Sequence, residues 1–89
     1  MSTDQNFKLE ASFVTLSMSI ASSAAISLGL APDTATNKVA VNTEVARFNI
    51  DLLDMLQNKT KGNLLKEEAD FLERVVADLK LKFVEVSKK

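Results

Sequence analysis

The chain has 89 residues, which is room for one domain with a single hydrophobic core. Apolar residues make up 46% and charged residues 26% of it, a composition typical of globular rather than disordered chains. Eleven basic against twelve acidic residues leave a net charge of −1, so no broad positive field can gather nucleic acid. We therefore expect a small folded domain that does not bind nucleic acid.

The chain contains neither cysteine nor histidine. Without cysteine it can form no disulfide, thiolate nucleophile or sulfur-ligated metal centre, and this composition suits the cytoplasm. Without histidine it lacks the usual proton shuttle near neutral pH and the commonest ligand of transition metals. We expect a cytoplasmic protein that is not an enzyme and uses no cofactor or metal.

Residues 1–6 are polar and aperiodic, which predicts a flexible tail before a single helical domain over residues 7–87. The first helix is expected at about residues 8–29. Its apolar residues follow two rows and form an unusually wide apolar arc. The rows are Leu9, Phe13, Leu16, Ile20 and Ala24, and Val14, Met18, Ala21, Ala25 and Leu28.

The stretch from Ala11 to Pro32 carries no charge and is long enough to span a bilayer as a helix. Six serines and one threonine between Ser12 and Ser27 lower its hydropathy below that of a typical spanning helix. A secretory signal would need a basic start, whereas Asp4 precedes the first lysine. Packing in a soluble protein is favoured, and a membrane anchor formed by residues 8–29 is the alternative.

A glycine, the only proline and several Asp, Thr and Asn residues punctuate residues 29–41, which predicts a helix end followed by a loop. This loop either crosses to the other end of the bundle or folds as an ordered flap. Asn37 is expected in a left-handed conformation. Asn42 is expected to cap the second helix, over residues 43–60.

The second helix is amphipathic. One apolar row holds Val45, Phe48, Leu52 and Met55, a flanking row holds Ala46, Ile50 and Leu53, and Phe48 is expected in the core. The polar face carries Asp51 and Asp54. Paired carboxylates can bind hard cations or transfer protons, but a solvated face that could meet a partner is the simpler interpretation.

The segment from Lys59 to Asn63 contains two lysines followed by a glycine. It precedes a third helix, which is expected at about residues 64–86. A phosphate site is conceivable there, but the spacing is not that of a phosphate loop, so we favour helix capping with Gly62 left-handed. Phe71 lies off the main apolar row of the third helix and would mark a contact surface if exposed. The row itself is Leu65, Ala69, Leu72, Val76, Leu79, Phe83 and Val86.

The run from Ile50 to Leu64, IDLLDMLQNKTKGNL, resembles a family of short bacterial proteins known only as a domain of unknown function, DUF1844. The resemblance departs from the usual pattern at Leu65, where members commonly have a capping Thr, and at Thr36-Asn37-Lys38, where they have Thr-Gly-Lys. It implies a cytosolic helical protein and brings no activity, ligand or catalytic residue. Supporting matches are Ser12-Phe13-Val14, Leu28-Gly29, Pro32, Val41-Asn42, Asp78-Leu79-Lys80 and Phe83-Val84-Glu85.

These patterns predict an all-α fold, a three-helix antiparallel bundle completed by homodimerisation. Two neighbouring helices cover only about half the circumference of the first helix, so its second apolar row needs another surface. We expect a non-catalytic interaction or scaffold protein. Either its apolar face or the face that carries Asp51 and Asp54 would bind the partner. The expected self-association surface is Phe13, Val14, Leu16, Met18 and Ile20.

Overall fold

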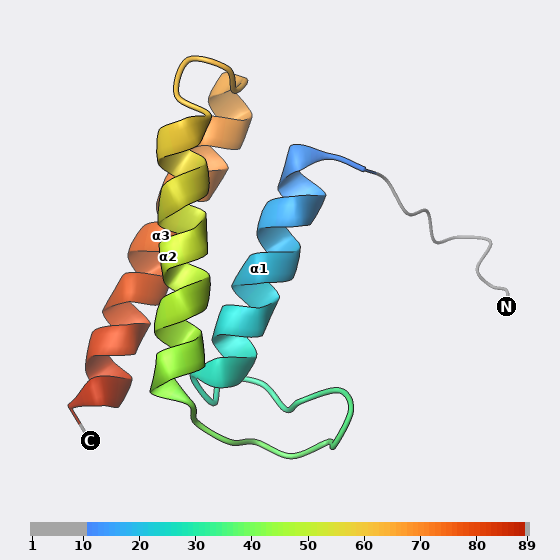
Figure 1. Ribbon diagram of the computed structural model, residues 1–89, viewed down its shortest axis with the longest axis vertical. Coiled ribbons are helices and arrows are strands. Elements are labelled where there is room, and N and C mark those ends of the chain that lie inside the picture. Colours follow the sequence, from blue (N-terminus) through green and yellow to red (C-terminus); the bar gives the residue numbers. More distant parts are fainter. Residues whose placement is uncertain (1–10, 89) are drawn as a thin grey trace, which may run out of the picture.

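The computed structural model describes residues 11–88, and every helix or strand element within this range is an α-helix. The helices are α1 (Phe13–Ser27), α2 (Thr43–Lys59) and α3 (Lys66–Ser87). They alternate in direction, so neighbours along the chain are antiparallel (Figure 1). The expected all-α fold with three helices is confirmed. The predicted tail over residues 1–6 lies outside the described residues.

Helix α1 begins five residues later than the expected residue 8. Ser12 is extended, with φ −133° and ψ 162°, and its Oγ accepts a hydrogen bond from the backbone N–H of Thr15 at 3.1 Å. This is the geometry of an N-cap, which satisfies an amide that has no partner inside the helix. The apolar row of the sequence includes Leu9, and for this reason the periodicity predicted an earlier helix start and did not reveal the cap at Ser12.

The hydrophobic core is small and centred on α2, which packs extensively against both other helices. Helices α2 and α3 each supply three buried apolar side chains, whereas α1 supplies only Ala24, and Leu28 follows just after its end. The row expected for α3 is confirmed at its centre, but Leu65 is 67% exposed because it precedes the helix in an extended conformation. The buried apolar residues are Ala24, Leu28, Ala46, Ile50, Leu53, Leu72, Val76 and Leu79.

The core position predicted for Phe48 is wrong, because its side chain is 61% exposed. The buried row of α2 is instead the flanking row that contains Ala46, Ile50 and Leu53. Ala24 of α1 and Ala46 of α2 are wholly buried in one cluster, and such small residues let two helix backbones approach closely. With the Ala46 row buried, helical geometry puts Phe48 on the outer side of α2.

Ser17 also lies on the buried face of α1 and is wholly inaccessible to solvent. Within residues 11–88, its Oγ has no hydrogen-bond partner. Ser27, near the end of the same helix, is buried too, but its Oγ donates to the carbonyl oxygen of Ser23 at 2.8 Å. The two serines therefore differ in hydrogen bonding although both contribute a small side chain to the packed face.

The loop between α1 and α2 folds back on itself, as the flap alternative predicted. The backbone N–H of Asn42 donates to the carbonyl oxygen of Ser27 at 2.8 Å, and Leu28 and Val41 form an isolated antiparallel bridge. The left-handed conformation expected for Asn37 is confirmed by its φ of 59°. The cap expected at Asn42 is also confirmed, since its side chain accepts from the amide of Val45.

We expect the substitution Gly29→Ala to lower the free energy of unfolding by about 2 kcal/mol or more. Gly29 has a φ of 79°, which costs a non-glycine residue about 1–2 kcal/mol, and a Cβ there would lie 2.8 Å from Val41 Cγ2. Gly62→Ala is the control, because Gly62 has a similar φ of 82° but open space around it. Urea denaturation measures both, and equal losses would contradict a role for the Val41 contact.

We expect Ser17→Ala to raise the free energy of unfolding by about 1 kcal/mol, because it removes a buried hydroxyl without a partner and introduces a better helix former. Ser27→Ala makes the same chemical change but deletes a hydrogen bond, so it should not stabilise. Thermal and urea denaturation of both variants provide the comparison. A Ser17→Ala variant less stable than the parent chain would contradict this account.

Candidate functional site

The most prominent surface feature is apolar. Within residues 11–88, twelve large apolar side chains are exposed, whereas eight apolar residues are buried. Single exposed apolar residues are ordinary, but contiguous ones mark interaction surfaces. The exposed ones are Val14, Leu16, Met18, Leu30, Val39, Val41, Val45, Phe48, Met55, Leu65, Leu81 and Val84.

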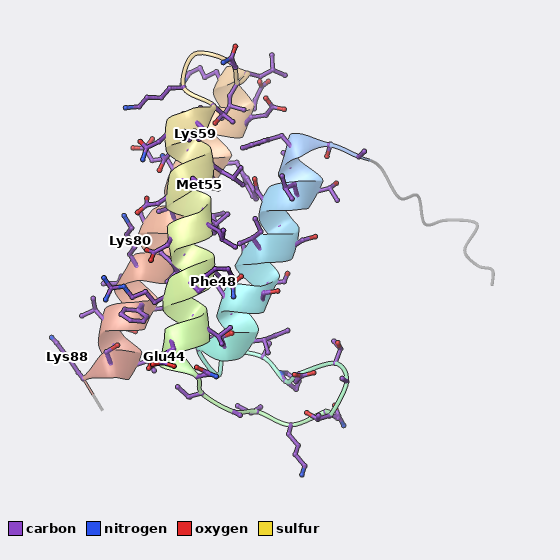
Figure 2. The ribbon with its side chains drawn as sticks, in the orientation of Figure 1. Glu44, Phe48, Met55, Lys59, Lys80 and Lys88 are labelled. Carbon is purple, nitrogen blue, oxygen red and sulfur yellow. The ribbon has the colours of Figure 1, made fainter. Side chains whose placement is uncertain are left out.

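One continuous row runs along α2, and we call Val45, Phe48, Leu52 and Met55 the α2 stripe. Their spacing of three, four and three residues places them on one side of the helix, roughly 130–150° around from the buried row. Leu52 is half-buried and the other three are exposed. Figure 2 shows Phe48 and Met55 along the same helix, with Glu44 and Lys59 towards its two ends.

The structure divides the self-association surface predicted on α1. Leu16 and Met18 are both exposed, but they are two residues apart and flank the buried Ser17 on opposite sides. Phe13 and Ile20 belong to the Leu16 side and are partly packed against the core. Val14 belongs to the Met18 side and is exposed. The five predicted residues therefore form two separate flanks of α1 rather than one patch.

The Leu16 flank is the one that lies beside the α2 stripe. Ser27 and Val45 line the same hollow at the loop end of the bundle. Ser27, Ser23, Ile20 and Leu16 are four, three and four residues apart, so they lie on one side of α1. The α2 stripe begins at Val45, at the same end of the bundle as Ser27, and runs towards the other end. Because α1 and α2 are antiparallel (Figure 1), these two rows run along one another.

Each carboxylate of the predicted partner face of α2 has a cation nearby. Asp54 Oδ2 lies 3.0 Å from Lys80 Nζ of α3, and the carboxylate of Asp51 lies 4.0 Å from Arg47 Nε. Arg47, Asp51 and Lys80 also line one hollow of about 270 Å³ between α2 and α3. In the part of the chain that the structure describes, no three acidic side chains gather where they could hold a metal ion. Asp54 therefore links two helices, and the face is mixed in charge.

The turn that could have bound phosphate is occupied by capping interactions. Thr60 Oγ1 donates to the carbonyl oxygen of Leu56 at 2.6 Å, and Gly62 has the predicted left-handed conformation. Glu68 Oε1 accepts the backbone N–H of Leu65 at 2.9 Å at the start of α3. A carboxylate thus already occupies the positive end of the helix, where an anion would bind. The geometry favours helix capping.

Phe71 lies off the main apolar row of α3, so its exposure could not be predicted from the sequence. In the structure it is half-buried. It borders a depression whose other lining residues, Arg74, Val75 and Asp78, also come from α3. A depression formed by one helix cannot enclose a ligand as a cleft between elements does. As for a membrane span, none of the helices within residues 11–88 combines the length and apolarity needed to cross a bilayer.

Comparison with known proteins identifies the family of this chain. No curated protein and no solved structure matches the chain. A family model described as a domain of unknown function, DUF1844, matches residues 10–85. This range includes α1, the loop, α2 and nearly all of α3. The chain therefore belongs to the DUF1844 family.

Proposed function

We propose that this protein is a non-catalytic interaction protein that acts as a cytoplasmic homodimer. The observation that carries the proposal is the apolar surface formed by the α2 stripe and the Leu16 flank of α1. Burying apolar surface stabilises by about 25 cal/mol per Å², so covering this surface favours association. The carboxylates that could serve catalysis, Asp51 and Asp54, face Arg47 and Lys80 instead.

The size of the surface approaches that of a small dimer interface. Helix α2 has 17 residues and is therefore about 25 Å long at ~1.5 Å per residue. With α1 beside it, the face is about 20 Å wide, since a helix with its side chains measures ~10 Å across. The resulting projected area of about 500 Å² compares with roughly 600–800 Å² of accessible surface per partner in small specific interfaces. A second copy could cover it in one contact.

We expect the purified full chain, without detergent, to have a mass of about twice the 9.7 kDa of one chain. Size-exclusion chromatography with light scattering measures this mass directly. Dilution should shift the equilibrium towards monomer, because association through a surface of this size is reversible. A monomer at every concentration would contradict the proposed dimer, and a large open-ended assembly would contradict a closed two-fold pair.

A further inference from the structure

We infer that the α2 stripe packs against the same stripe of a second copy, with the two α2 helices antiparallel and Glu44 of each copy paired with Lys59 of the other. This inference rests on the proposed dimer and specifies its interface. It moves the centre of self-association from α1, where the sequence placed it, to α2.

The first argument is the distribution of charge along the stripe. Glu44 precedes Val45 at the first turn of α2, and Lys59 follows Met55 by one helical turn. Both charged residues are exposed, and Figure 2 shows them towards opposite ends of the helix. Neither takes part in an ion pair within residues 11–88. The apolar stripe therefore ends in two unpaired charges of opposite sign.

These charges select one orientation of a second copy. A parallel pair of α2 helices would place Glu44 beside Glu44 and Lys59 beside Lys59, and like charges disfavour such a contact. An antiparallel pair places each Glu44 beside a Lys59. Two-fold symmetry then creates the ion pair twice, once at each end of the interface.

The same register also brings together three residues of the α2 stripe, whereas Val45 comes opposite the polar Asn58 of the second copy. Pairing Glu44 with Lys59 of the second copy puts the two-fold axis between Asp51 and Leu52, midway along α2. Phe48 and Met55 lie equally far from this axis, so Phe48 faces Met55 of the second copy. A thioether against an aromatic ring is a favourable contact. Leu52 and Asp51 lie on either side of the axis, and because Asp51 points about 100° away, Leu52 is next to Leu52 of the second copy, one residue further along.

The neighbouring side chains leave the stripe accessible. Beside Leu16, the α1 row that runs along the stripe contains Ser23, which is small and exposed. Asp51 is adjacent to the axis but lies about 100° around the helix from Leu52, and it is held near Arg47. The carboxylate therefore lies at the edge of the contact, where water can solvate it.

The test exchanges the two charges. Glu44→Lys and Lys59→Glu each place like charges at both ends of the homodimer, so each variant alone should dimerise about tenfold or more weakly than the parent chain. An equimolar mixture of the two variants should recover tight dimers, because the heterodimer has opposite charges at both ends. Sedimentation velocity gives the dissociation constants, and native mass spectrometry distinguishes heterodimer from homodimer.

The control is Glu67→Lys, which makes the same charge change in the first turn of α3 and should leave the dimerisation constant unchanged. Circular dichroism checks that each variant stays helical. Recovery in the mixture cannot come from repaired folding, since both chains keep their own substitutions. The difference in dimer affinity between the mixture and the single variants should decrease at high salt, because salt screens exposed ion pairs.

The outcomes separate this inference from the proposed function. Dimerisation of both variants at the parental level would overturn the α2 interface and leave the dimer itself intact. A mixture that dimerises no better than its components would overturn the antiparallel pairing. A parent chain that is monomeric at every concentration would overturn both the interface and the proposed dimer.

Discussion

The packing of α1 against α2 through small buried residues is the constraint on which the rest of the structure depends. Ser17 and Ala24 on α1, and Ala46 on α2, are wholly buried, and small side chains at such positions let two helix backbones approach closely. Once the Ala46 row faces α1, helical geometry places Phe48 and Met55 on the outside. The surface that we assign to a partner is therefore a consequence of how the core is packed.

The loop between α1 and α2 maintains this approach. The hydrogen bond from Asn42 to Ser27 joins the end of one helix to the start of the next, and the bridge between Leu28 and Val41 adds a second contact. Gly29 allows the chain to turn back at once, because its positive φ and the nearby Val41 exclude a side chain. The flap therefore fixes the relative position of α1 and α2 at one end of the bundle.

Much of the fold could be predicted from the sequence, because helix type, turns and caps depend on local spacing and on a few special residues. Asn37, Asn42 and Gly62 adopt the conformations expected of them. The choice between the two apolar rows of α2 could not be predicted in this way, since both rows have helical periodicity and only the tertiary contact with α1 distinguishes them. The same limit applied to the sites. Helical spacing puts Asp54 on the polar side of α2, but it does not reveal the ion pair with Lys80 of α3, which lies 26 residues away in sequence.

Phe48 and Met55 of the stripe contribute no buried side chain to the core of a single chain. Ala46, Ile50 and Leu53 supply the buried contacts of α2, so polar residues at Phe48 and Met55 would leave the core unchanged and make the surface more soluble. A large exposed apolar surface also exposes a monomer to non-specific association. We propose that contact with another molecule explains the apolar character of these positions. A second copy satisfies that requirement with the residues already present, since the charges at the two ends of α2 are complementary to themselves only in the antiparallel orientation.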